Sequence, residues 1–286
     1  MGSKDMIFYP KNVITCKGKK IDLSVPKIMG IINVTPDSFY SKSRYEVHQV
    51  LTTCESMLKD GAMFVDVGGY SSRPGADHIA VDEEKRRTIP IIESIAQEFP
   101  ELIISIDTFR SVVAASALDA GASIINDISG GELDEAMFEL VASRDVPYIL
   151  THMRGTPQNM QLEPTYEAIT NEILTSLRNR LTILQTMNVS DVIIDPGFGF
   201  GKTLDQNYQL LSELSQFKDL KVPILVGLSR KSMIYKLLDS SPEEALNGTS
   251  VLHTISLQKG AQILRVHDVK DAAECIKLWS ACANLD

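Results

Sequence analysis

The sequence predicts an α/β protein, a single (β/α)8 TIM barrel with an N-terminal β-hairpin that caps its closed end. Eight short apolar runs are rich in Ile, Val and Leu and lack polar alternation, as buried parallel strands do. Stretches of helical length separate these runs. Each run also stops at polar residues suited to binding a small molecule. In a closed parallel barrel all such strand ends meet on one face, where active sites are built.

The segment before the first strand has a different pattern. Residues 14–16 and 20–23 flank Gly18, and they predict a β-hairpin with a glycine turn. We expect residues 1–26 to form this structural cap and residues 27–286 to form one catalytic barrel domain. No linker rich in Pro, Gly or Ser divides the chain further.

Eight strands are then expected in succession. They are residues 27–33, 63–66, 102–107, 123–127, 147–152, 192–195, 223–227 and 262–265. The polar residues at their ends are Asn33, Asp66, Asp107, Asn126 with Asp127, His152, Asp195, Ser229, and Arg265 with His267. A barrel would gather these side chains at the carboxyl ends of its strands.

Amphipathic stretches between the strands predict the helices. Residues 83–98 carry Ile92 and Ile95 on an apolar face, and residues 166–187 form the longest such stretch. The pattern Leu-x-x-Gly-Ala occurs just before a strand at residues 58–62, 118–122 and 257–261. Glycine is the usual residue just past a helix end, so each copy marks a helix closing into a short loop. Right-handed crossovers wind such units into either a closed barrel or an open doubly wound sheet.

Composition narrows the class of protein. The chain has 286 residues and a net charge of −9, which argues against broad binding to nucleic acid or anionic lipid. Its four cysteines include no CxxC pair, so we expect reduced thiols. No apolar stretch approaches the roughly 18 residues that span a bilayer, and the first residues lack the order of a signal peptide. We expect a cytoplasmic protein.

The loops that follow the first two strands each allow a structural and a ligand-binding interpretation. Pro36, Asp37 and Ser38 follow the first strand, and an ordinary turn explains them without a ligand. The second loop, residues 68–76, combines glycines and hydroxyls with Arg73, which suits an anion. A mobile surface loop with an incidental arginine is the alternative.

Acidic and amide side chains end three apolar strands. Asp107, Asn126 and Asp195 stand in strongly apolar sequence, and burying a carboxylate costs several kcal/mol unless it is paired or hydrogen-bonded. Together they offer acceptors to a heterocycle rich in N–H groups. A divalent cation is the alternative, because hard cations prefer oxygen ligands.

Basic residues end the last two strands. Arg265 and His267 lie on the same side of their strand, about 7 Å apart, and Lys231 follows the seventh strand. Donors aimed one way suit a phosphate or diphosphate, which barrels often bind near their last strands. The five histidines lack the spacing of a zinc or iron site.

The glycine-rich run GFGFGKT, residues 197–203, matches neither common phosphate motif. A P-loop needs a glycine where Pro196 stands, and the dinucleotide fingerprint needs GxGxxG. We expect a loop that approaches a ligand closely and leads into a helix near Asp205.

With these residues in view, the chain resembles the dihydropteroate synthases over nearly all of its length after the hairpin. The shared segments are MGIINVTPDSF (29–39), GGYSSRPGA (68–76), SIDT (105–108), NDISGG (126–131), HMRGTP (152–157), DPGFGFGK (195–202), and SRKS (229–232) with RVHDV (265–269). The resemblance implies condensation of (7,8-dihydropterin-6-yl)methyl diphosphate with 4-aminobenzoate, which yields 7,8-dihydropteroate and diphosphate. It also implies a homodimer and Mg²⁺ as cofactor.

The resemblance also implies roles for particular residues. Asp107, Asn126, Asp195 and Lys231 would bind the pterin, and Asn33, Arg265 and His267 the diphosphate, with Asn33 also meeting Mg²⁺. The aminobenzoate pocket would comprise Ser72, Arg73, Pro74, Phe200 and Ser229. The expected catalytic set is Asp107, Asp195, Lys231, Arg265 and His267. Asp66, Asp127 and His152 receive no ligand and are expected to support the site.

The chain departs from the family pattern in its first two loops. Tyr70 stands where glutamate is usual, Ser72 where threonine is usual, and residues 40–44 replace the common Ser-Asp-Gly-Gly. Two rivals are a pterin-dependent methyltransferase and a pterin-binding relative without turnover. The methyltransferase would not need Arg73, Lys231 or the pair of Arg265 and His267. Diphosphate release that requires aminobenzoate separates the synthase from the non-catalytic relative.

Overall fold

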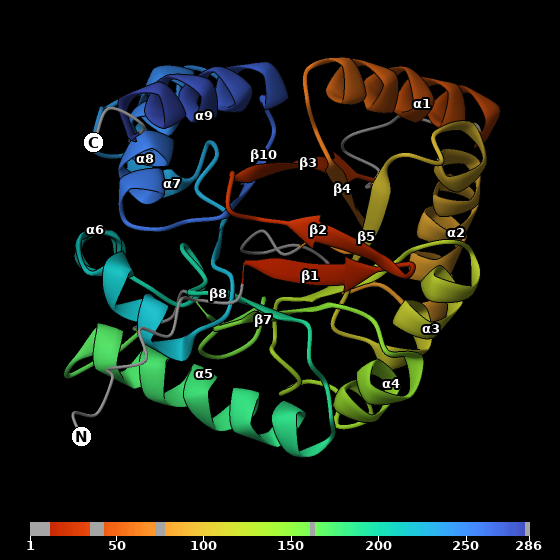
Figure 1. Cartoon of the computed structure of the whole chain (residues 1–286), viewed down its shortest axis with the longest axis horizontal. Coiled ribbons are helices and arrows are strands. Elements are labelled where there is room, and N and C mark those ends of the chain that lie inside the picture. Colours follow the sequence, from red (N-terminus) through yellow and green to blue (C-terminus); the bar gives the residue numbers. More distant parts are fainter. Residues whose placement is uncertain (1–11, 35–42, 72–77, 161–163, 284–286) are drawn as a thin grey trace, which may run out of the picture.

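In a computed structural model, eight parallel strands close into a barrel with helices outside it (Figure 1). The structure describes residues 12–34, 43–71, 78–160 and 164–283. Neighbouring strands follow the order β8-β7-β6-β5-β4-β3-β10-β9. A parallel bridge between Ile194 and Ile224 joins the two ends of this order. The barrel is therefore closed, and the alternative of an open doubly wound sheet is wrong.

The barrel strands match the eight expected positions. They are β3 (Lys27–Asn33), β4 (Phe64–Gly68), β5 (Ile103–Asp107), β6 (Ile124–Asp127), β7 (Tyr148–Thr151), β8 (Val192–Asp195), β9 (Leu225–Val226) and β10 (Ile263–Val266). β4 continues two residues beyond Asp66, because Gly68 still pairs with Asp107 of β5. β9 is shorter than expected, because only its two residues pair with β10.

Helices cover the outside of the barrel, and a 3-10 turn precedes β9. They are α1 (Ser43–Lys59), α2 (Val81–Glu98), α3 (Ser111–Asp119), α4 (Met137–Arg144), α5 (Ile169–Thr186), α6 (Leu204–Ser212), η1 (Leu214–Leu220), α7 (Ser232–Tyr235), α8 (Leu246–Gln258) and α9 (Val269–Ala283). Gly61, Gly121 and Gly260 all adopt positive φ, so the three repeated helix ends are built as expected. No helix in the described ranges is both long and apolar enough to cross a bilayer.

The N-terminal hairpin closes one end of the barrel. Strands β1 (Val13–Cys16) and β2 (Lys19–Asp22) pair antiparallel and lie across the barrel in Figure 1. Ile14 and Leu23 are fully buried in a cluster with the inward-facing apolar residues of the strands. This cluster includes Met29, Phe64, Ile124, Ile193 and Ile263. The hairpin is thus an apolar plug, and the polar strand ends lie at the opposite end.

Candidate active site

Four barrel strands each carry an inward-facing polar residue two positions after an apolar residue of the plug. Side chains two positions apart point to the same side of a strand, so a residue that follows a member of the plug by two also faces the interior. The pairs are Phe64 with Asp66, Ile124 with Asn126, Ile193 with Asp195, and Ile263 with Arg265. Asn33, Gly68, Asp107 and Asn126 are paired in succession across β3 to β6. Strand periodicity therefore delivers the expected residues to one face.

Asp66 joins two of these residues. Its Oδ2 accepts a hydrogen bond from Asn126 Nδ2 at 2.8 Å and another from Arg265 Nε at 2.6 Å. Arg265 Nη2 donates to Asp107 Oδ2 at 2.7 Å. Arg265 thus balances the charge of Asp107, one of the carboxylates expected to need a ligand or a metal, together with that of Asp66. Asp66 supports the site by fixing Asn126 and Arg265.

One acceptor of this cluster has no partner. The side chain of Asp66 is fully buried, and its Oδ1 lacks a hydrogen bond within the described structure. An unpartnered buried carboxylate oxygen is costly, so it favours a ligand that donates N–H or O–H groups. Gly68 lies against the cluster, because a Cβ there would be in van der Waals contact with Asp107 Cβ at 3.4 Å.

Burial shifts the protonation of the site. It raises the pKa of Asp107 to about 7, against the opposing charge of Arg265 and with the help of Asp66. Burial also raises the pKa of Asp195, which Lys231 opposes. The pKa of Lys231 falls to about 8, again through burial, while Asp195 acts in the other direction. Groups shifted toward neutrality in this way are typical of functional sites.

Lys231 lies between the glycine-rich loop and the carboxylates. Its Nζ donates to the carbonyl oxygen of Phe198 and lies 4.4 Å from the centre of the Phe200 ring. A Cβ added to Gly227 would be 4.0 Å from both Lys231 Nζ and Asp195 Oδ2. Lys231, Phe200 and Asp195 therefore border one space, as the expected pterin and aminobenzoate positions require.

The ends of the last two strands are tied together. Ser229 Oγ and His267 Nδ1 are 3.0 Å apart, and Ser229 Oγ also accepts a hydrogen bond from the His267 backbone. Arg230 forms a double ion pair with Asp268 at 2.8 and 2.9 Å. Sequence reasoning missed Arg230, because the SRKS segment does not show which of its two cations faces the site.

Asp127 and His152 have structural partners, as expected of supporting residues. Asp127 accepts hydrogen bonds from the backbone of Ser129 and Gly131 and from the hydroxyl of Tyr148. His152 contacts Lys202, with 3.2 Å between Nδ1 and Nζ. Burial lowers the pKa of His152 to about 2, and the charge of Lys202 adds to this effect. The imidazole is therefore neutral.

Tyr70, which replaces the usual glutamate, is bound at the base of the second loop. Its hydroxyl accepts a hydrogen bond from Gln158 Nε2 at 2.5 Å and lies 3.3 Å from His78 Nδ1. The ring packs edge-on against Phe109, with 5.0 Å between centroids. The aromatic residue is thus accommodated by neighbours from two other loops.

Several expected residues lie outside the described structure. These are Pro36, Asp37, Ser38 and Phe39 of the first loop, and Ser72, Arg73 and Pro74 of the second. Asn33 is half-buried at the end of β3. Mg²⁺ usually keeps several waters and binds one or two protein oxygens plus substrate phosphates, so a lone carboxamide oxygen here fits it. No group of three or more His, Cys, Asp or Glu side chains in the described ranges could hold a metal.

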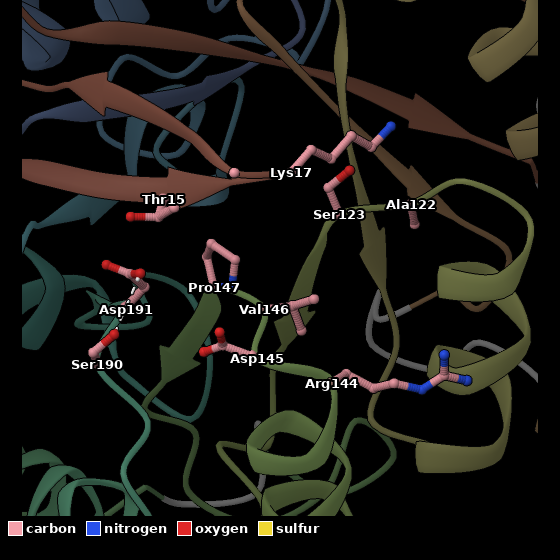
Figure 2. A pocket seen from close by; sticks show the side chains of 11 residues that line it. Thr15, Lys17, Ala122, Ser123, Arg144, Asp145, Val146, Pro147, Ser190 and Asp191 are labelled. Carbon is pink, nitrogen blue, oxygen red and sulfur yellow. Dashed lines mark hydrogen bonds between the residues drawn. The ribbon is translucent and has the colours of Figure 1, made fainter.

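A cavity of about 360 Å³ lies at the other end of the barrel (Figure 2). Its walls are the hairpin turn with Lys17 and the segments that precede β6, β7 and β8, including Ser123, Asp145 and Asp191. None of the expected site residues lines it. The chemistry expected at the carboxyl ends of the strands is therefore separate from this cavity.

Known proteins share both the sequence and the fold. A family described as pterin binding enzyme matches residues 29–267. The dihydropteroate synthases of Haemophilus influenzae and Escherichia coli are each 40% identical to this chain, over 93% of it and 97% and 94% of their own lengths. A Yersinia pestis dihydropteroate synthase, solved with a sulfonamide drug complex, superposes with a TM-score of 0.89 and 38% identity, covering 95% of this chain and 99% of that one.

A second solved relative adds a ligand. The Xanthomonas albilineans dihydropteroate synthase with 4-aminobenzoic acid superposes with a TM-score of 0.87 and 37% identity, over 95% of this chain and 98% of its own. The similarity extends over the segments that hold the polar strand ends, the interior cluster and the glycine-rich loop described above. The chain belongs to the pterin binding enzyme family and, within it, to the dihydropteroate synthases.

Proposed function

We propose that this chain condenses (7,8-dihydropterin-6-yl)methyl diphosphate with 4-aminobenzoate, releasing 7,8-dihydropteroate and diphosphate. The observation that carries the proposal is the buried cluster of Asp66, Asp107, Asn126 and Arg265, with the free oxygen of Asp66. It offers acceptors to a flat ring rich in N–H groups. The ligands of the solved relatives, a sulfonamide and 4-aminobenzoic acid, support the same reaction.

In this mechanism the pterin binds first to the middle strands. Asp107, Asn126 and Asp195 accept hydrogen bonds from its ring, and Lys231 donates to it. Asp107 must be ionised to accept fully, and with its pKa raised to about 7 it is about half ionised at neutral pH before the ligand binds. Donors on the pterin then favour the carboxylate form.

The leaving group departs toward the last strand. The bond between the methylene carbon and the diphosphate oxygen breaks, and the electron pair leaves with the diphosphate. Arg265 and His267 face that developing charge, where fixed donors are most effective. Asn33 and the diphosphate would hold Mg²⁺, which would supply further charge neutralisation. The cation left on the methylene delocalises into the pterin ring beside Asp107 and Asp195.

The arylamine nitrogen then bonds to the methylene carbon, and the proton it loses passes to the released diphosphate or to water. An aromatic amine is unprotonated at neutral pH, so its nitrogen lone pair is available without a strong general base. We therefore propose a dissociative substitution. Single-turnover kinetics tests this step: a trace of diphosphate released without aminobenzoate is expected, and complete dependence on aminobenzoate would contradict it.

We further propose a cytoplasmic homodimer. The neighbouring helices α8 and α9 each carry an exposed apolar residue, Val251 at 51% and Leu278 at 70% exposure. Leu237 and Leu238, which follow α7, are also more than half exposed. All four cysteines are free thiols, in keeping with a reducing compartment.

The activity itself is tested by mixing both substrates with Mg²⁺ and measuring diphosphate. Sustained release over many turnovers that requires aminobenzoate and is inhibited by a sulfonamide is the expected result. Binding of the pterin diphosphate without any release would instead identify a non-catalytic relative.

A further inference from the structure

Lys202 is a buried lysine that the proposed chemistry does not use. Its side chain is nearly inaccessible, with 3% exposure, and burial lowers the pKa of its amino group, against the charge of Asp195. Burying an amino group is costly, so a lysine at such a position needs a specific set of hydrogen-bond acceptors.

The acceptors of Lys202 come from the glycine-rich loop and from the end of β7. Nζ donates to the carbonyl oxygens of Gly197 at 2.7 Å, Phe200 at 3.0 Å and His152 at 3.3 Å. It also lies 3.2 Å from Nδ1 of His152, which the neutral imidazole offers as an acceptor. The Lys202 amino group therefore binds the loop of residues 197–202 to the end of β7 through these carbonyl oxygens.

The loop is shaped to enclose this cation. Gly197, Gly199 and Gly201 all have positive φ, which favours glycine. A Cβ on Gly197 would lie 1.9 Å from the His152 carbonyl oxygen, and one on Gly201 would lie 2.5 Å from that of Arg154. The loop thus lies directly on the segment after β7, with its carbonyls turned toward Lys202.

The same loop presents groups to the candidate active site. Phe198 accepts a hydrogen bond from Lys231 through its backbone oxygen, and the Phe200 ring lies beside the Lys231 ammonium. At its start, the Gly197 amide donates to Asp195 Oδ1 at 2.7 Å. Movement of the loop would therefore displace Phe200 and Lys231 together.

We propose that Lys202 is a positioning residue that sets the aminobenzoate side of the active site through the loop of residues 197–202. This inference rests on the proposed function. It predicts a graded effect, because Asp107 and Asn126 are held by Asp66 and Arg265 and not by this loop, whereas Asp195 and Lys231 each contact it. Loosening the loop should therefore weaken pterin binding less than aminobenzoate binding.

The test compares Lys202→Met with Lys59→Met, which removes an exposed lysine whose ion-pair partner is Glu55. In Lys202→Met the KM for aminobenzoate should rise about tenfold or more, as for the loss of a hydrogen bond to a charged group. The Kd of a pterin lacking the diphosphate, measured by calorimetry, should rise by a clearly smaller factor than this KM. Amide hydrogen exchange in residues 197–202 should accelerate. Lys59→Met should change none of the three.

The outcomes distinguish this inference from the proposed function. Equal KM values for aminobenzoate in the two variants, or an equal loss of pterin affinity and aminobenzoate affinity, would overturn the role of Lys202. If the wild-type chain releases no diphosphate, the proposed function fails, while loop exchange and direct aminobenzoate binding still test Lys202. If Lys202→Met does not fold, Lys202→Gln, which keeps an N–H donor, must show the same selectivity. Failure of both variants to fold would show a general structural role and overturn the proposal.

Discussion

At the residue scale, Asp66 connects the residues assigned to the pterin with those assigned to the diphosphate. One carboxylate oxygen orients Asn126, which we assign to the pterin, and Arg265, which we assign to the diphosphate. Arg265 is also paired with Asp107, so the four strands β4, β5, β6 and β10 share one network. Changes at any member should therefore affect the others.

Removing the charge of Asp66 should destabilise the protein. Asp66→Asn leaves the half-buried Arg265 with a single carboxylate partner; breaking a fully buried pair costs about 3–5 kcal/mol, so a loss of about 2–3 kcal/mol is expected here. Urea unfolding measures this loss. Glu55→Gln, which breaks an exposed ion pair with Lys59, is the control and should cost less than about 1 kcal/mol. Equal losses in the two variants would rule out the network.

Pterin affinity should depend on the ionisation of Asp107. Its pKa in the free protein is raised to about 7, so the acceptor form is lost as the pH falls below 7. Affinity should then weaken by up to about tenfold per pH unit. Calorimetry between pH 5 and pH 8 checks this. Asp107→Asn should bind weakly with no such dependence, and an unchanged pH dependence in that variant would assign the titration to another group.

Sequence reasoning could locate most of these residues but not their partners. Asp107, Asn126 and Arg265 each end an apolar strand, and strand alternation fixes the side on which they lie. Which carboxylate pairs with Arg265 depends on the stagger of strands far apart in the sequence, so Asp66 was expected only to support the site. Lys202 followed a glycine run that matched no phosphate motif, and its acceptors are backbone carbonyls, which leave no signal in the sequence.

At the element scale, the hairpin and the strand ends perform separate tasks. Ile14 and Leu23 fill the interior at one end of the barrel, while the polar cluster lies at the other. Glycine turns and apolar runs predicted these elements well. The extension of β4 to Gly68 was not predicted, because glycine is a poor strand former and its place is fixed by pairing with Asp107.

A cavity in the plug should reduce stability without affecting the chemistry. Ile14→Ala removes a fully buried side chain of β1 and should lower the free energy of unfolding by about 2–5 kcal/mol. The KM values for both substrates should equal those of the wild type. Urea unfolding measures the loss of stability, and steady-state kinetics on the same sample measures the two KM values. A clear change in either KM would mean that the hairpin takes part in substrate binding.

At the scale of the whole molecule, neutral His152 links stability to pH. Its pKa is lowered to about 2 in the fold, so the unfolded chain binds a proton near pH 6.5 that the folded chain does not. Stability from this source is present above pH 6.5 and is lost as the pH falls toward 2. Between pH 7 and pH 5 the loss should be about 2 kcal/mol.

Comparison with His152→Asn isolates this contribution, because other buried groups titrate equally in both proteins. The wild type should lose more stability than the variant between pH 7 and pH 5 in urea unfolding. Equal losses of stability in the wild type and the variant would mean that His152 is protonated in the fold. The hydrogen bond from Lys202 would then have to be reassigned.

The central claim is that one face of the barrel binds the pterin on its middle strands and the diphosphate on its last strand. Calorimetry with a hydroxymethyl pterin and with its diphosphate tests this division directly in Asp107→Asn and His267→Gln. Asp107→Asn should weaken binding of both ligands, whereas His267→Gln should weaken only the diphosphate. Equal losses for both ligands in His267→Gln would contradict the division of the site.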